Sequence, residues 1–422
     1  MLQSRIAFLS ASRETPLKKD TIRMTSFTEM PFSAELQQRL AAAHFINPTP
    51  IQAETIPQAM AGKDIMATAQ TGTGKTLAFL VPIIEAQLRR PAQRNVETLV
   101  LVPTRELAMQ VHEQYEALRG KATMPAALVI GGLPEKRQIQ ALRSGATLVV
   151  ATPGRLEDFL SRRLVDLRHV SILVLDEADR MLDMGFLPAI RRIVGGLPTQ
   201  RQTMCFSATL EASVVGLVND CMRNPVRIAL GSVLKPAETV ELQAFETAAA
   251  GKPEVLRQLL SAEKGQTLVF ARTKRGTERI AKGLIRDGFS AAMIHGDRSQ
   301  GQRTSALDGF DGGRFQVLVA TDLASRGIHV RDVAHVINYD LPKLAEDFIH
   351  RVGRTGRMGS RGLASTLVSG AEVLELRQIE RALKLRIERK QIEGGTFVRP
   401  PRCRQNSLAS RTLTEMPGEI FT

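Results

Sequence analysis

Short runs of β-branched and other apolar residues alternate along this chain with amphipathic helical stretches, and this alternation constrains the fold more than any other feature of the sequence. Each run is nearly continuous in apolar residues, which is typical of strands that are buried on both faces of a sheet. Strands that alternate with helices predict a mostly parallel sheet flanked by helices. The first series of runs covers residues 64–69, 98–103, 126–132, 147–153, 171–178 and 203–209.

A second series with the same alternation follows after a break. The break, residues 224–239, contains two prolines and no strong helical period, which indicates a linker. We expect an α/β fold with two tandem domains, over residues 24–228 and 239–393, joined by a linker at 229–238 and separated by a cleft. The second series covers residues 267–273, 291–297, 315–322, 335–340 and 363–369.

The excess of basic residues points to a polyanionic partner. Lys and Arg number 57 against 43 Asp and Glu, a formal net charge of +14, which favours nucleic acid or a membrane surface. The cysteines, Cys205, Cys221 and Cys403, lack the spacing of metal ligands, so we expect no disulfide framework or zinc site and a reducing compartment. Because no apolar run reaches the roughly 18 residues of a membrane span, we expect no membrane partner.

The two ends of the chain are expected to lie outside the domains. Residues 1–23 faintly resemble a transit peptide, but they include Glu14 and Asp20, so a disordered extension is the favoured interpretation. Residues 379–393 have apolar residues at helical spacing and predict a terminal helix on the second domain. The remainder, 394–422, is expected to be disordered.

Residues 69–76, AQTGTGKT, follow the first predicted strand and precede an apolar helix. They differ from the phosphate-loop pattern G-x-x-x-x-G-K-T only at Ala69. The amides around Gly72 and Gly74 suit phosphate oxygens, the Lys75 ammonium reaches the β and γ phosphates, and the Thr76 hydroxyl suits Mg²⁺. The alternative is a glycine-rich turn before an ordinary helix.

Two further segments supply the other parts of a nucleotide site. Asp176 and Glu177 end the strand at 171–178, where consecutive carboxylates suit metal coordination and water activation, although acids also favour helix N-termini. Residues 350–357, HRVGRTGR, present three arginines and two glycines, which suits phosphate binding or, alternatively, a solvated basic turn. A phosphate loop and acids in one domain, with arginines in the other, are typical of nucleotide-dependent closure.

In their order and spacing, these motifs closely resemble those of the DEAD-box ATP-dependent RNA helicases of superfamily 2, over roughly residues 27–370. Residues 176–179 form the tetrad that names the family, and Ala69 is normal in its phosphate loop. The resemblance implies two tandem RecA-like domains, a bacterial-type core without an extra RNA-binding module, and ATP and Mg²⁺ as cofactors.

The family's ATP-site roles carry over residue by residue. Gln52 would read adenine, Phe27 would stack on it, and Glu177 would activate the attacking water. Arg354 and Arg357 match the arginine fingers, while Thr76 and, through water, Asp176 would hold the metal. The implied nucleotide-binding set is completed by Thr71, Gly72, Thr73, Gly74, Lys75 and His329, and the implied coupling residues are Asp179, Ser207, Thr209 and His350.

The resemblance also implies an RNA-binding set at other strand ends. Glycines that expose amides, together with arginines, suit contact with the sugar-phosphate backbone, so binding should be insensitive to sequence and sensitive to salt. Contact with the 2′-hydroxyl would favour RNA over DNA. The implied residues are Pro103, Thr104, Arg105, Gly131, Gly132, Thr152, Gly154, Arg155, Arg272, Gly296, Asp297, Gln300, Arg303, Thr321 and Asp322.

The chain departs from the family pattern at His329, which stands where an acid near the ATP ribose is usual. An imidazole can still bond a hydroxyl, so we hypothesise weaker or more pH-dependent ATP affinity, which Asp at this position should reverse. His44 also replaces a common glycine before Phe45.

The expected activity is local unwinding of short RNA duplexes or remodelling of ribonucleoprotein by a cytoplasmic monomer that acts on single-stranded or short duplex RNA. An ATP-gated RNA clamp carries the same motifs and stays an alternative, as does a DNA helicase. A transporter ATPase is disfavoured because no membrane segment is present. Ribosomal partners and a role in ribosome biogenesis are expected only by analogy with bacterial members.

Overall fold

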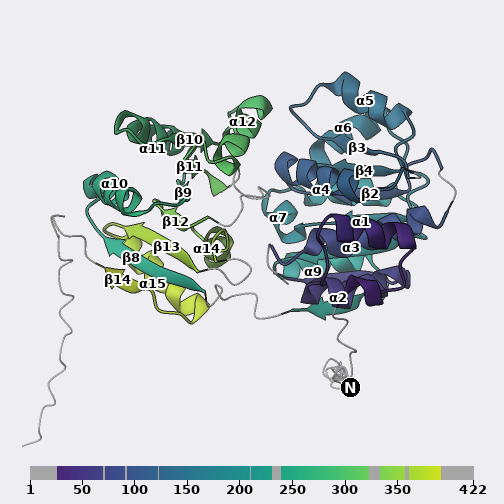
Figure 1. Ribbon diagram of the computed structural model, residues 1–422, viewed down its shortest axis with the longest axis horizontal. Helices are drawn as coiled ribbons and strands as arrows, with labels where there is room; N and C mark the ends of the chain where they lie inside the picture. The colour runs from purple at the N-terminus through teal and green to yellow at the C-terminus, as the bar shows by residue number, and fades with distance from the viewer. Residues whose placement is uncertain are drawn as a thin grey trace, which may run out of the picture.

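The computed structural model describes residues 26–69, 72–90, 93–121, 123–209, 211–230, 239–322, 333–356 and 361–390. The expected extension at 1–23, residues 231–238 of the expected linker and the expected tail at 394–422 lie outside the described residues. Two α/β bodies stand side by side, one built from the first half of the chain and one from the second (Figure 1). Among the described helices, none has the length and apolar character needed to span a bilayer.

The first body is a parallel sheet with helices on both faces. Its described strands run in the order β3-β4-β2-β5-β6-β1-β7, and every pairing is parallel. Apolar clusters lie against both faces, which explains why the strands read as continuous apolar runs. The strands are β1 (Ile65–Thr68), β2 (Thr98–Leu101), β3 (Ala126–Val129), β4 (Leu148–Ala151), β5 (Ile172–Leu175), β6 (Gln202–Ser207) and β7 (Val226–Ala229).

The helices of this body connect successive strands. Their starts follow local capping signals, such as Thr104 before α4 and Pro153 at the start of α6. The elements are η1 (Phe27–Glu29), α1 (Ala34–Ala42), α2 (Pro50–Met60), α3 (Lys75–Leu88), α4 (Arg105–Leu118), α5 (Glu135–Arg143), α6 (Pro153–Ser161), α7 (Ala178–Asp183), α8 (Leu187–Gly195) and α9 (Ala212–Cys221).

The second body repeats this architecture, with described strands in the order β10-β11-β9-β12-β13-β8-β14, all parallel. Its strands are β8 (Val240–Glu246), β9 (Thr267–Phe270), β10 (Ala291–Ile294), β11 (Val317–Ala320), β12 (His335–Asn338), β13 (Gly362–Val368) and β14 (Glu388–Lys390). Its helices are η2 (Ala249–Gly251), α10 (Lys252–Ala262), α11 (Lys274–Arg286), α12 (Gln300–Asp311), α14 (Ala345–Val352) and α15 (Glu372–Leu383). The predicted α/β fold class, with two tandem parallel sheets, is confirmed.

Two local predictions were wrong. The segment 224–239, predicted as linker, begins with β7, which pairs with β1 as an edge strand. Asp64 fixes this return, because its carboxylate accepts from the amides of Arg223 (2.7 Å) and Thr203 (2.7 Å). The helix predicted over 379–393 ends at Leu383, where Lys384 takes a left-handed φ of 50° and the chain turns into β14 beside β8.

The two bodies touch through buried polar side chains. Gln300 Nε2 on α12 donates to Glu106 Oε1 on α4 (3.0 Å), and the Arg303 guanidinium lies 2.7 Å from Glu106 Oε2. All three residues are buried. In Figure 1, α12 and α14 lie on the side of the second body that faces the first. The strand ends that carry the predicted motifs therefore meet across one cleft.

Candidate active site and nucleic-acid interface

The predicted phosphate loop lies between β1 and α3. Gly72 and Gly74 have positive φ angles of 86° and 93°, which side chains other than glycine rarely adopt. A Cβ atom at Gly74 would also lie 2.3 Å from Gln52 Nε2. Lys75, the first residue of α3, is buried, and its Nζ donates to the carbonyl of Ala69 (3.0 Å). Lys75 thus reaches back to the residue where the motif begins, while Gln70 and Thr71 lie outside the described residues.

Gln52 ties the loop to the neighbouring helix. Its Nε2 donates to Gly74 O (3.0 Å) and its Oε1 accepts from Thr49 N (2.9 Å). An amide has two hydrogens and two carbonyl lone pairs, so one of each remains for a ligand such as adenine. Phe27 is buried and lies 6.4 Å, centroid to centroid, from Phe32.

The acid pair lies where β5 ends. Asp176 is buried and accepts from the amide of Glu177 (3.0 Å), and Glu177 adopts a left-handed φ of 51°. Burial raises the pKa of Asp176 to about 7, and the nearby Lys75 charge opposes this shift. Burial also raises the pKa of Glu177, while Lys75 and Arg354 oppose it. Two crowded, desolvated carboxylates of this kind favour a bound cation.

Asp179 connects the acid pair to the end of β6. Its Oδ2 accepts from the amides of Ala208 (2.9 Å) and Thr209 (3.0 Å) and from Thr209 Oγ1 (3.3 Å). The Ser207 hydroxyl accepts from Thr209 N as well (3.4 Å). Asp179 therefore ties the segment 207–209 to α7, which begins directly after the acid pair.

The second domain contributes Arg354 and His350 to the same cleft. Arg354 is buried, and the Glu177 charge opposes the lowering of its pKa that burial causes. The pKa of His350 falls to about 4 because of burial, with the Asp179 charge opposing and the Arg354 and Lys75 charges reinforcing it. Groups from both domains therefore lie close enough in the cleft to influence one another's charge. Arg357 and His329 lie outside the described residues.

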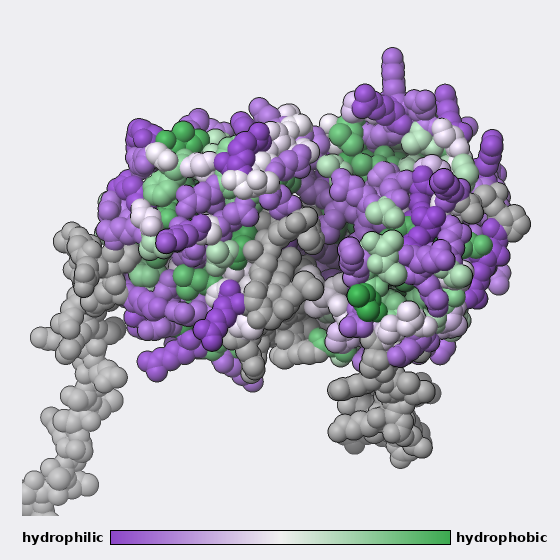
Figure 2. All heavy atoms as spheres, in the orientation of Figure 1, coloured by the Kyte–Doolittle hydropathy of each residue, from purple (hydrophilic) through white to green (hydrophobic). Residues whose placement is uncertain are grey.

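A cavity of about 600 Å³ lies between the domains and contains many of the predicted RNA-binding residues. A Cβ atom at Gly131 or Gly132 would lie 3.0 Å or 2.4 Å from the Arg105 guanidinium, so this arginine packs closely against the two glycines. Figure 2 shows a hollow between the domains whose visible walls are mostly hydrophilic. The residues that line the cavity are Pro103, Thr104, Arg105, Glu106, Gly131, Thr152, Gly154, Arg155, Asp158, Met184, Phe186, Gly296 and Arg303.

The other predicted RNA-binding residues of the second domain lie around the same strand ends. The Asp322 carboxylate holds the buried Arg351 by two bonds (2.6 and 2.7 Å), and Asp297 pairs with Lys274. Thr321 is buried after β11. Arg272, which is partly exposed, follows β9, and its guanidinium lies 3.6 Å from a Glu372 oxygen.

Comparisons with known proteins agree with this geometry. The DEAD/DEAH box helicase family matches residues 49–217, and the helicase conserved C-terminal domain matches residues 251–359. The chain is 39% identical to the DEAD-box ATP-dependent RNA helicase CshA of Geobacillus kaustophilus (strain HTA426), over 87% of this chain and 78% of that protein. The chain belongs to the DEAD-box ATP-dependent RNA helicase family.

Other DEAD-box proteins match over different shares of their length. DEAD-box ATP-dependent RNA helicase 14 of Arabidopsis thaliana is 43% identical over 81% of this chain but only 56% of its own length. The chain therefore spans little more than half of that relative. The solved structure of S. cerevisiae Dbp5 bound to RNA and ADP BeF3 is 30% identical and matches with a TM-score of 0.79, over 87% of this chain and 96% of that one.

The tetrad and the phosphate loop each offer an oxygen donor that fits Mg²⁺, namely the Asp176 carboxylate and the Thr76 hydroxyl at the start of α3. Within the described ranges, no three His, Cys, Asp or Glu side chains form a group that could hold a metal alone. A magnesium ion here would therefore need water and nucleotide oxygens as further ligands, which is how this ion usually binds.

The sequence analysis missed the contacts that three residues of the site make. Glu106 bonds both Gln300 and Arg303, Arg351 holds Asp322, and Asp158 holds Arg155. Each lies within or beside a recognised motif, but its partner is far along the chain or its charge is opposite to that expected of an RNA site. A buried acid amid a basic motif is the signal that could have identified Glu106.

Proposed function

We propose that this protein is an RNA-stimulated ATPase that unwinds short RNA duplexes locally or remodels ribonucleoprotein. The observation that carries the proposal is the meeting of Lys75, Asp176 and Glu177 with Arg354 across one cleft. In the same arrangement, Glu106 of the first domain contacts Arg303 of the second domain, beside the candidate RNA-binding residues. Closing on RNA and completing the ATP site would then be one event.

In this proposal each residue has a distinct task. Lys75 exchanges the Ala69 carbonyl for phosphate oxygens, and Gln52 offers its remaining amide hydrogen and lone pair to adenine. Glu177 positions and deprotonates water, while Arg354, with Arg357, faces the charge that develops on the transferred phosphoryl group. Phe27, Thr71, Thr73 and His329 complete the nucleotide pocket.

Mg²⁺, held by Thr76 and through water by Asp176, would supply charge neutralisation on the phosphate oxygens. Asp179, Ser207, Thr209 and His350 would couple the ATP site to closure, as their shared contacts at the cleft suggest.

RNA would bind by its backbone. The cavity presents glycine amides and arginines and has little aromatic surface for base stacking, which favours sequence-insensitive binding. The RNA set of the second domain, including Arg272, Asp297, Thr321 and Asp322, would extend the surface along its strand ends. The similarity to the Dbp5 structure, which was solved bound to RNA, supports the proposal that RNA binds here.

The test measures ATP hydrolysis with and without a short single-stranded RNA of mixed sequence. We expect RNA to raise turnover at least about tenfold. We expect Lys75→Ala to abolish turnover, because the variant loses the positive charge that binds and stabilises the phosphate oxygens. A turnover that RNA leaves unchanged would refute the proposal. Equal stimulation by DNA would instead favour a DNA helicase.

An RNA clamp is the second candidate, because the buried contact between Glu106 and Arg303 can hold the closed form. Displacement of a roughly 10-base-pair duplex, compared with the lifetime of the closed complex, separates the two functions. Fast displacement of the duplex supports the helicase. A closed complex that persists on RNA without displacing the duplex supports the clamp.

We further propose domain limits of 24–228 and 239–393 with a linker at 229–238. Each sheet takes its strands from one of these ranges, apart from Ala229, the last residue of β7, which lies one residue past the first limit. A monomer in the cytoplasm, with ribosomal or messenger RNA as substrate and a part in ribosome biogenesis, is proposed by analogy with bacterial members of the family.

A further inference from the structure

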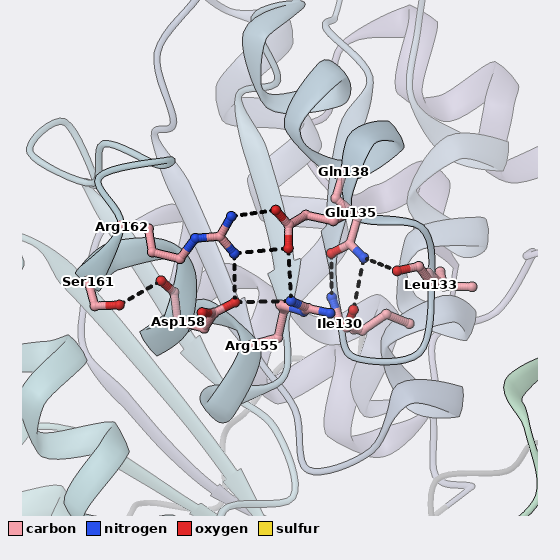
Figure 3. A network of polar contacts seen from close by, with 8 residues as sticks. All are labelled: Ile130, Leu133, Glu135, Gln138, Arg155, Asp158, Ser161 and Arg162. Carbon is pink, nitrogen blue, oxygen red and sulfur yellow. Dashed lines mark hydrogen bonds and ion pairs between the residues drawn. The ribbon is translucent and has the colours of Figure 1, made fainter.

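An ion-pair network joins α5 to α6 beside the candidate RNA surface. Figure 3 shows two arginines, Arg155 and Arg162, that share the carboxylates of Glu135 and Asp158. Arg155 NH1 lies 3.0 Å from Asp158 Oδ2 and 3.4 Å from Glu135 Oε2. Arg162 NH1 lies 2.9 Å from Glu135 Oε2 and 3.4 Å from Asp158 Oδ2, and its NH2 bonds Glu135 Oε1.

The two arginines differ in position. Arg155 and Asp158 line the cavity between the domains, whereas Glu135 and Arg162 do not. Arg155 has 23% of its side chain exposed and lies over the Phe159 ring (5.5 Å), while Arg162 is 45% exposed on the outer side of the network. A phosphate that enters the cavity can therefore reach Arg155 but not, in the same pose, Arg162.

Binding of a phosphate by Arg155 has an electrostatic cost. Arg155 contacts both carboxylates through NH1 alone, so a phosphate that binds its guanidinium stands close to two negative charges. Arg162 already contacts both of them, and its bond to Glu135 is the main reason that the pKa of this carboxyl lies below its usual range. Arg155 can thus bind a phosphate while Arg162 stays paired with both acids.

We propose that Arg162 is a positioning residue for RNA binding, which frees Arg155 for an RNA phosphate by holding Glu135 and Asp158. This inference rests on the proposed function. Arg162 then affects the affinity for RNA although it does not itself contact RNA. Glu135 has the opposite effect, because this acid competes with the phosphate for Arg155.

The test compares RNA affinity and its salt dependence in Arg162→Ala, Arg155→Ala, Glu135→Gln and the Arg162→Ala/Glu135→Gln pair. Loss of the contacts between Arg162 and the two acids beside Arg155 predicts an about three- to tenfold weaker affinity for Arg162→Ala. The slope of log affinity against log salt should stay as in the wild type, whereas Arg155→Ala should lose about 0.7 of slope with its phosphate contact. Adding Glu135→Gln should restore most of the affinity.

Two controls complete the design. Arg143→Ala removes an exposed charge from the far end of α5 and should change affinity less than twofold. The kcat at saturating RNA should stay within about twofold of wild type in Arg162→Ala, which a folding defect would not allow.

The inference is overturned if Arg162→Ala behaves like Arg143→Ala, if it loses slope as Arg155→Ala does, or if Glu135→Gln gives no recovery. Absence of RNA binding by the wild-type protein would overturn the proposed function and this inference together. Wild-type binding with any of those three results would overturn the inference alone.

Discussion

At the residue scale, Glu177 combines the properties that water activation needs. It is the N-cap of α7, directly after Asp176, with a left-handed backbone that turns it away from the strand direction. Burial raises its pKa, so its carboxylate accepts a proton more readily than an exposed glutamate does. The charges of Lys75 and Arg354 oppose this rise of the pKa.

Glu177→Gln should therefore lower kcat for ATP by at least about 100-fold while ATP and RNA still bind, because an amide cannot take the proton. Turnover is measured at saturating RNA, and binding with a fluorescent ATP analogue. Glu54→Gln removes an exposed carboxylate from α2 and serves as the matched control. Near-normal turnover of Glu177→Gln would rule out the proposed role.

At the scale of elements, α4 and α12 are linked by Glu106, which was not predicted as a functional residue. Its two oxygens contact Gln300 and Arg303 of the other domain, and all three residues are buried. Its loss should weaken closure and leave each sheet intact.

Glu106→Ala should raise the RNA concentration that gives half-maximal ATPase about tenfold or more, because truncation leaves a buried guanidinium unpaired in the closed form. Glu113→Ala, an exposed site on the same helix, is the control and should match the wild type. If the two variants behave alike, the contact does not contribute to closure.

A second element-scale prediction concerns β12. His335 is buried, its Nε2 lies 2.7 Å from Ser365 Oγ on β13, and burial lowers its pKa to about 4. Since the folded pKa lies below the usual 6.5, its contribution to stability is fully present above pH 6.5 and is lost as pH falls toward 4. The loss by pH 4 is on the order of 3 kcal/mol.

His335→Val should make the urea midpoint of the second domain less dependent on pH between 6.5 and 4.5. Fluorescence of Tyr339 in a Tyr115→Phe background reports this domain, because the chain has two tyrosines and no tryptophan. His169→Val on the exposed surface should retain the wild-type dependence. An equal pH dependence in all three proteins would contradict the assignment.

Sequence patterns located most of the buried strands, because a run of apolar and β-branched residues is a local feature that can be read without knowing its partners. They missed β8, which lies between β13 and β14 in the second sheet, and also the edge strands β7 and β14. The edge strands are held by distant partners, Asp64 for the return into β7 and β8 for β14. They also missed Glu106 and Arg351, whose meaning depends on residues far along the chain. Periodicity carries no information about such partners.

At the scale of the whole molecule, closure around RNA limits how much duplex can be opened. One closure distorts a single short stretch, and duplex stacking is worth about 1.4 kcal/mol per step. Strand displacement should therefore be efficient near 10 base pairs and negligible beyond about 25. Displacement rates that do not fall with duplex length would instead indicate processive translocation.

The central claim is that ATP lies between Lys75 and Glu177 on one domain and Arg354 on the other. A crystal structure with single-stranded RNA and a non-hydrolysable ATP analogue tests it most directly. The account predicts the Arg354 guanidinium within hydrogen-bond distance of the terminal phosphoryl oxygens, with Lys75 released from the Ala69 carbonyl. An Arg354 side chain far from the nucleotide while RNA is bound would contradict it.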